Sequence, residues 1–365
     1  MQTMHPEGHI EVRSLGIDDL NEEERAAAAA LPPLISVDSH VMEPNTLWEQ
    51  LPPRLYESVR ATLDVIGFGE QPLKGAGDPH ARLLDQDRDG VAAEVLFPNN
   101  GMALFGIEDV DAQREAMKLY NDFLADFCKV APDRFFGVAA ISVYDIDAAI
   151  REMHRALDMG LIGIMVWQVP DPRLPFMCDH YDRLWAAAAE AGAPVHLHIL
   201  TGHTYFRDPG RRKGPEKIRG SVNQKTHDMI NSLFDFIFSG AFDRHPKLRL
   251  VLAESECGWL PFILQQWDYY FERFRNKESF PISRKPSEIF NEHVYCTWLE
   301  DFSGTRQFTW WGQDNLMWSN DYPHPNMTFP FSRENIIRHI GNLPSELQLK
   351  LIRDNALRLY RFKLD

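Results

Sequence analysis

Cysteine is scarce in this sequence and widely scattered. Four cysteines stand among 365 residues, and no two of them have the C-x-x-C spacing of a zinc finger or a redox motif. Neither a disulfide framework nor a structural zinc site is therefore indicated. Isolated thiols are typical of a reducing compartment, so we expect a cytoplasmic protein.

Long apolar runs and an excess of positive charge are also missing. No run approaches the roughly 18 residues that a membrane-spanning helix needs, and the N-terminus lacks the basic-then-apolar pattern of a signal peptide. The net charge is −15, from 53 acidic and 38 basic residues. A nucleic-acid surface needs a broad basic face, and an anionic membrane would repel this chain. We expect a soluble protein that binds neither nucleic acid nor membranes.

Apolar stretches alternate with helical patterns from residue 34 onward. The apolar stretches are continuous, as in strands buried on both faces of a parallel sheet. Eight such units with helical segments between them predict a (β/α)8 TIM barrel, with a doubly wound open sheet as the alternative. No G-x-G-x-x-G follows the first strand, which weighs against the open sheet. The expected strands are 34–40, 92–98, 135–142, 161–167, 194–200, 248–254, 293–299 and 315–321.

The first 33 residues are predicted to be an N-terminal extension. Residues 19–30 are acidic and then alanine-rich, which indicates a short helix, and Pro32 and Pro33 would stop it. Residues 34–365 contain no low-complexity linker, so we expect one catalytic domain there.

Acidic and histidine residues collect where the expected strands end. In a barrel the chemistry lies at the C-terminal ends of the strands. Burying several charged groups together costs several kcal/mol unless a cation compensates them, so we predict a metal site; imidazole–carboxylate sets suit Zn, Fe and Mn. His196 and His198 share one face of their strand, and His198 is favoured because it is nearer the strand end. The candidate ligands are Asp38, His40, Glu43, His198, Glu254, Asp321 and His324, and His203 or His227 could replace one of these histidines.

Four segments carry a family resemblance: "VDSHVMEP", "PVHLH", "RHPKLRLVLAESECGWLPF" and "WSNDYPHP". In this order and spacing they resemble the amidohydrolase-2 family, whose members include metal-dependent decarboxylases and C–C bond hydrolases on a (β/α)8 barrel. The resemblance covers most of residues 34–360. It implies that Asp38, His40, His198 and Asp321 bind a metal.

The chain also departs from the family pattern. Many members begin with H-x-H or E-x-H, and the hydrolytic members usually place a histidine where this chain has Glu254. Here Asp38 opens the motif and Glu43 is added. Four carboxylates beside two or three imidazoles resemble a non-haem di-iron site, and D-x-H-x-x-E-P resembles barrel-fold di-iron monooxygenases of diterpenoid (platensimycin and platencin type) antibiotic biosynthesis. That resemblance implies two irons, dioxygen and hydroxylation of a hydrophobic terpenoid or acyl substrate carried on coenzyme A.

The segment 204–225 gives a separate indication of the substrate. It holds seven basic residues against two acidic ones, a charge of +5 in an acidic protein. A solvated loop is the plain interpretation. Arg and Lys at the barrel mouth would also bind the phosphates of coenzyme A. The candidate phosphate-binding residues are Arg207, Arg211, Arg212, Lys213, Lys217 and Arg219.

Two other functions stay open. The first is a mononuclear zinc or manganese hydrolase or decarboxylase acting on a carboxylated substrate, in which Glu254 or His324 would act as the catalytic proton-transfer group. The second is a catalytically inactive barrel that serves as a binding module. The monooxygenase would need a separate reductase, because the chain has no flavin or NAD motif. We expect a homo-oligomer from the habits of such barrels.

Overall fold

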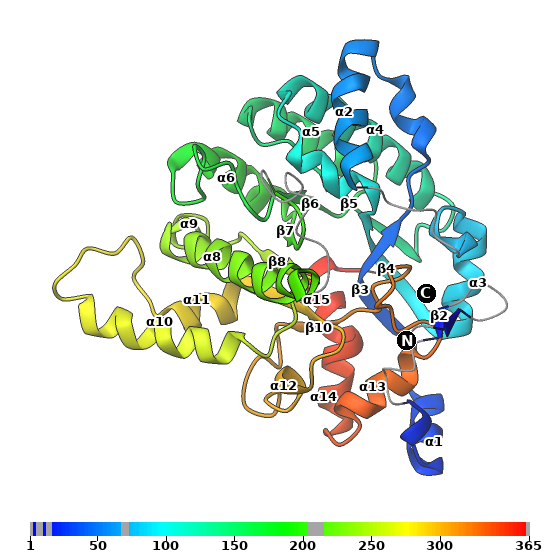
Figure 1. Ribbon diagram of the computed structural model, residues 1–365. Coiled ribbons are helices and arrows are strands. Elements are labelled where there is room, and N and C mark those ends of the chain that lie inside the picture. The colour runs from blue at the N-terminus through cyan, green and yellow to red at the C-terminus, as the bar shows by residue number, and fades with distance from the viewer. Residues whose placement is uncertain (1–2, 5–9, 12–16, 67–72, 203–214, 363–365) are drawn as a thin grey trace.

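The fold is a parallel eight-stranded barrel surrounded by helices (Figure 1). The structure is a computed structural model and describes residues 3–4, 10–11, 17–66, 73–202 and 215–362. Strands β3 to β10 pair in sequence order, each parallel to the next. They are β3 (Leu34–Val41), β4 (Val91–Pro98), β5 (Phe135–Ala140), β6 (Gly163–Val166), β7 (Val195–His198), β8 (Leu250–Ala253), β9 (Val294–Trp298) and β10 (Leu316–Trp318).

The two ends of this sheet meet beside β3. Backbone N–H groups join β3 to the segment after β10: His40 donates to the Tyr322 carbonyl, and Asp321 donates to the Asp38 carbonyl. These bonds nearly close the barrel, so the predicted (β/α)8 fold is confirmed and the open sheet is excluded. Almost every strand residue is buried, in agreement with the continuous apolar runs.

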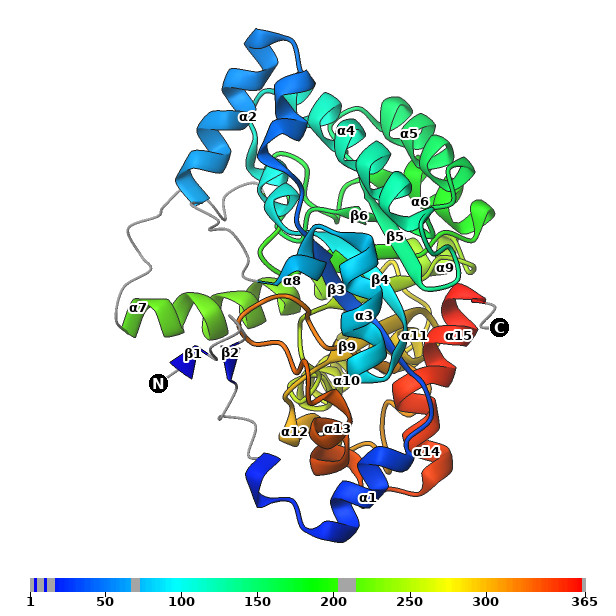
Figure 2. The same cartoon turned by 90° about the vertical axis from the view of Figure 1, so that its right-hand side faces the viewer.

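Helices cover the outside of the barrel (Figures 1 and 2). Asp78, Asp109 and Asp145 cap the N-termini of α3, α4 and α5, where a carboxylate satisfies free backbone N–H groups and contributes about 1 kcal/mol each. The helices are α2 (Pro53–Ile66), α3 (Pro79–Asp89), α4 (Val110–Cys128), α5 (Ile146–Asp158), α6 (Asp182–Ala191), α7 (Pro215–Ile218), α8 (Lys225–Phe238), α9 (Ala241–Arg244), α10 (Leu260–Phe274), α11 (Pro286–His293), α12 (Phe302–Thr305), α13 (Ser332–Ile340), α14 (Ser345–Leu349) and α15 (Asn355–Tyr360).

The expected short helix before the barrel is present as α1 (Glu22–Ala30). It lies beside α13, far away in the sequence, in both views (Figures 1 and 2). Arg333 of α13 donates to the carbonyls of Ala28 and Leu31, which ties the segment to the barrel. A two-stranded pair, β1 (Thr3–Met4) and β2 (Ile10–Glu11), precedes it. The division into an extension and one catalytic domain stays a prediction. Within the described ranges, no helix is long and apolar enough to cross a membrane.

Candidate metal centre

Four strands deliver acidic and imidazole side chains to one end of the barrel. Asp38 and His40 lie in β3, His198 is the last residue of β7, Glu254 directly follows β8, and Asp321 comes three residues after β10. All of these positions are at C-terminal strand ends, where barrels carry their chemistry. The β3–β4 register shifts between Ser36 and Ser39, and such irregularities re-aim side chains beside active sites.

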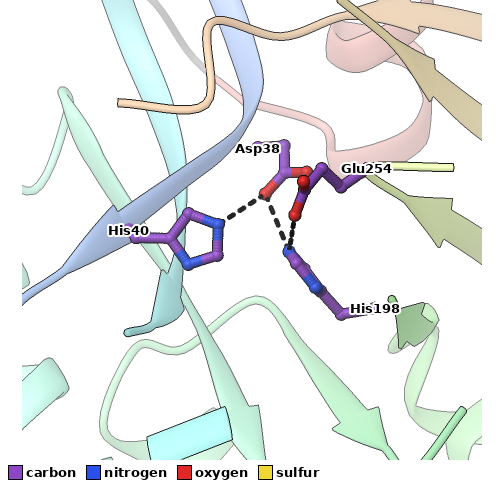
Figure 3. A group of neighbouring side chains, drawn as sticks. All are labelled: Asp38, His40, His198 and Glu254. Atoms are coloured by element: carbon purple, nitrogen blue, oxygen red, sulfur yellow. Dashed lines mark hydrogen bonds and ion pairs between the residues drawn. The ribbon is translucent and has the colours of Figure 1, made fainter. Parts of the chain in front are cut away.

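The ligand atoms lie close enough to surround a metal ion (Figure 3). Asp38 Oδ1 is 3.5 Å from His40 Nε2 and 3.2 Å from His198 Nε2. His198 Nε2 is 3.9 Å from Glu254 Oε2, and His40 Nε2 is 3.3 Å from Asp321 Oδ1. With bonds of about 2.1 Å, neighbouring ligand atoms of one metal are separated by roughly 3.0–3.4 Å. The separations of 3.2–3.5 Å among Asp38, His40, His198 and Asp321 are close to the edges of a single coordination shell. The 3.9 Å between His198 and Glu254 is longer, which places Glu254 at the border of that shell.

Backbone hydrogen bonds point the imidazole lone pairs into this cluster. Nδ1 of His40 donates to the Pro98 carbonyl and Nδ1 of His198 donates to the Ile199 carbonyl, each at 2.8 Å. Nε2 of each ring is then the metal-facing nitrogen, as metal-binding histidines require. Within the described part of the chain, three buried atoms of the cluster have no hydrogen-bond partner: Asp38 Oδ2, His40 Nε2 and Asp321 Oδ2. Unpaired acceptors of this kind fit a divalent cation.

The protein groups alone perturb the two histidines in opposite directions. Burial, aided by the charge of His324, lowers the pKa of His40 to about 4. Burial would also lower the pKa of His198, but the charge and hydrogen bond of Asp38 and the charge of Glu254 outweigh it and raise that pKa to about 9. Without a metal, His198 therefore acts as the cation that faces Asp38.

His324 lies next to the cluster with both ring nitrogens occupied. Its Nδ1 is 2.8 Å from Asp321 Oδ1, its Nε2 is 2.8 Å from Asn99 Oδ1, and its ring centre is 4.0 Å from that of His40. Both partners are acceptors, so both nitrogens carry protons. Burial would lower the pKa of His324, but the charge of Asp321 raises it. The ligand atoms of His324, His40, Glu254 and Asp321 also lie within 4.8 Å of one another, so His324 is a candidate ligand as well as a candidate proton donor.

Glu43 does not join the ligand atoms, contrary to the prediction. Its buried carboxylate accepts from the backbone N–H groups of Asn99, Asn100 and Gly101, at 2.8–3.2 Å. These donors occupy three of the roughly four lone-pair sites of the carboxylate, and Glu43 belongs to neither group of described side chains that could hold a metal ion. Glu43 instead holds the turn that presents Asn99 to His324, so it supports the site from outside. Burial raises its pKa to about 7.

The remaining histidine alternatives fall into three cases. His196 is a core residue whose nitrogens meet the Ile164 carbonyl at 3.0 Å and the Tyr360 hydroxyl at 2.8 Å. His227 is an exposed residue of α8. His203 lies outside the described residues.

The predicted phosphate-binding residues can be placed only in part. Arg207, Arg211, Arg212 and Lys213 lie outside the described residues, as does the side chain of Lys217. Arg219 is exposed and pairs with Glu216 at 3.0 Å. Phosphate recognition stays a prediction.

A cavity of about 310 Å³ opens beside the cluster and includes Glu254 in its wall. Thr297 Oγ1 accepts from the Glu254 N–H at 2.8 Å and so holds this residue at its positive φ of 52°. Asn99 and Thr297 were not among the predicted site residues. Asn99 follows a strand end and could have been found by that signal, whereas a threonine inside a strand carries none. The cavity is lined by Ile199, Val222, Lys225, Thr226, Glu254, Ser255, Glu256, Trp259, Thr297, Leu299, Ser319 and Asn326.

Comparison with known proteins identifies the family. The amidohydrolase-2 family model (described as "Amidohydrolase") matches residues 71–362, and the chain therefore belongs to this family of enzymes. The γ-resorcylate decarboxylase of Rhizobium sp. (strain MTP-10005) is 27% identical over 303 residues, which cover 78% of this chain and 86% of that protein.

Solved structures share the fold. An amidohydrolase of Mycobacterium avium subsp. paratuberculosis K-10 superposes with a TM-score of 0.73 at 20% identity, over 91% of this chain and 100% of that one. A dihydroxybenzoic acid decarboxylase of Polaromonas sp. JS666, solved with bound manganese and the inhibitor 2-nitroresorcinol, gives a TM-score of 0.67 at 21% identity, over 91% and 97%.

These findings correct the predicted activity. The iron-dependent monooxygenase is wrong, because four curated relatives are γ-resorcylate decarboxylases. The oxidoreductase class and the role in antibiotic biosynthesis are wrong with it. The expected pair of irons with dioxygen loses its basis together with the monooxygenase. The structure supports a candidate metal site, and a single metal ion fits the decarboxylase alternative. The coenzyme A-linked substrate, the reductase and the homo-oligomer stay predictions.

Proposed function

We propose that this protein is a decarboxylase that uses one divalent metal ion, manganese or zinc, to release CO2 from a small aromatic carboxylic acid. The observation that carries the proposal is the cluster itself, in which unpaired buried acceptors converge beside a doubly protonated His324. The decarboxylase relatives support the reaction class. A cavity of about 310 Å³ is at the small end of ligand pockets and suits a single ring.

In this proposal the residues that bind the metal are Asp38, His40, His198 and Asp321. Their imidazole and carboxylate donors match the preferences of manganese and zinc. When bound, the metal supplies a Lewis acid that compensates the buried carboxylates and attracts an anionic substrate. Glu254 would lie at the border between the metal and the cavity.

The protein groups supply the proton that decarboxylation consumes. When the bond between the ring carbon and the carboxylate breaks, CO2 leaves and the electron pair stays on the carbon, which must take up a proton. His324 holds protons on Nδ1 and Nε2 next to the cluster. Glu254 is a second candidate donor, because burial raises the pKa of its carboxyl despite the nearby Lys225.

The proposal is tested with hydroxybenzoates that carry labelled carbon in the carboxyl group. Manganese-loaded protein is expected to release labelled CO2 from at least one of them, γ-resorcylate (2,6-dihydroxybenzoate) being the first choice. His324→Gln is expected to lose at least 100-fold in rate, as removal of a general acid does. His227→Gln, at an exposed position of α8, serves as the matched control and is expected to keep the wild-type rate. Metal-loaded protein that releases no CO2 from any acid in the series would overturn the proposal.

A further inference from the structure

Among the described residues that line the cavity, Lys225 is the one with a cationic side chain. It is the first residue of α8, and its side chain is 21% exposed. Its Nζ lies 3.4 Å from Glu254 Oε1. Lys225 thus lies in the cavity wall next to Glu254, the residue that the cavity shares with the metal cluster.

Several acidic side chains lie near the cavity, and Lys225 is placed to offset their charge. Glu254 and Glu256 are part of the wall, and Asp38 and Asp321 lie behind Glu254 in the metal cluster. Burial raises the pKa of Glu256 to about 8, so this wall residue is largely protonated at pH 7. The like charge that an anionic substrate meets therefore comes mainly from Asp38 and Asp321. A lysine at the boundary offsets that repulsion and offers up to three donors in a partly desolvated position.

The contact of Lys225 with Glu254 leaves this lysine able to accept another partner. A charge-assisted bond between an ammonium and a carboxylate is typically about 2.7–2.9 Å long, and this one is longer. Among the described residues, Glu254 is the single acceptor within hydrogen-bond distance of Nζ. The other two protons of the ammonium group are therefore available to a ligand in the cavity.

The rest of the wall suits a flat ring held next to that ammonium group. Trp259, Leu299 and Ile199 give apolar surface, while Thr297 and Ser319 give hydroxyls. From this arrangement we propose that Lys225 is a substrate-positioning residue that binds the carboxylate of an aromatic acid, which takes the place of Glu254 as its partner. The inference rests on the proposed decarboxylase function and names the anion-binding group of that site.

The experiment compares 2,6-dihydroxybenzoate with 2,6-dihydroxybenzamide, which has nearly the same shape and no charge. Binding is measured by calorimetry on metal-free protein and on manganese-loaded protein that carries His324→Gln, in which turnover of the acid is expected to be at least 100-fold slower. In both forms Lys225→Met is expected to weaken binding of the acid about tenfold or more and to change binding of the amide less than twofold. Lys225→Arg is expected to restore most of the affinity for the acid. Lys247→Met, at an exposed lysine before β8, is the matched control and is expected to bind both ligands as the wild type does.

Equal weakening of both ligands by Lys225→Met, or no weakening of either, would overturn the inference and leave Lys225 as a structural partner of Glu254. Protein that keeps Lys225 and binds the acid no better than the amide in either form would overturn it too. Release of CO2 is measured separately. If CO2 is released but Lys225→Met does not distinguish acid from amide, only the anion site fails. If the acid depends on Lys225 but no CO2 is released, the decarboxylase proposal fails and the anion site stands.

Discussion

Arg82 and Glu94 form a buried ion pair next to the metal centre. The free energy of unfolding that is lost with this pair can be worked out from the structure. Arg82 Nε donates to Glu94 Oε2 at 2.7 Å, and both side chains are at most 1% exposed. Arg82 Nη1 also donates to the His40 carbonyl at 2.9 Å. Removing one partner of a buried ion pair leaves an uncompensated charge, which costs about 3–5 kcal/mol. Gln86 and Ser39 still donate to Glu94, so we expect Arg82→Met to cost about 3 kcal/mol.

The assay is urea unfolding at pH 7. It compares the wild type with Arg82→Met, Glu94→Met, the double variant and a control variant. The double variant buries no unpaired charge, so it is expected to be more stable than Arg82→Met. Arg219→Met is the control, because the exposed pair of Arg219 with Glu216 contributes about 0–1 kcal/mol. The reasoning is refuted if Arg82→Met costs no more than Arg219→Met, or if the double variant loses the sum of the two single losses.

Three further variants test other parts of the account. Burial raises the pKa of Glu43 from 4.5 to about 7, so the stabilising contribution of this group is complete below pH 4.5 and is lost as the pH rises through 7. In Glu43→Gln the free energy of unfolding is therefore expected to fall by about 3 kcal/mol less than in the wild type between pH 5 and 8. His198→Gln is expected to bind manganese at least tenfold more weakly in equilibrium dialysis, whereas His196→Gln, in the core, keeps wild-type affinity. Thr297→Val leaves the Glu254 N–H without its acceptor, and we expect a loss of about 1–3 kcal/mol in thermal unfolding together with slower CO2 release.

Much of the barrel could be predicted because its signals are local. A buried parallel strand is a short apolar run between turn signals, and each of the eight expected runs overlaps a strand of the structure. The ends were harder to predict. The sequence predicts a strand over all of 315–321, but β10 ends at Trp318 and Asp321 lies in the following loop with a φ of 50°. Asp321 donates its N–H to the Asp38 carbonyl there, and a contact with so distant a residue cannot be read from one segment.

The site was harder to predict because ligand choice depends on distant backbone. The closeness of Glu43 to Asp38 and His40 in the sequence predicts a third ligand from this segment. Its lone pairs in fact face the N–H groups of 99–101, more than fifty residues away. Counting it among the carboxylates favoured the di-iron interpretation. The residue types in a sequence do not show which oxygen lone pairs already accept hydrogen bonds. A metal ligand needs a free lone pair, whereas a supporting residue uses its lone pairs for hydrogen bonds.

The most direct test of the central claim is a titration of metal-free protein with manganese while CO2 release from a labelled hydroxybenzoate is followed. The account predicts no release before manganese is added and saturation at one equivalent per chain. Asp38→Asn, which weakens a carboxylate ligand, is expected to need a large excess of metal. Release of CO2 by metal-free protein, or saturation only at two equivalents, would contradict the account.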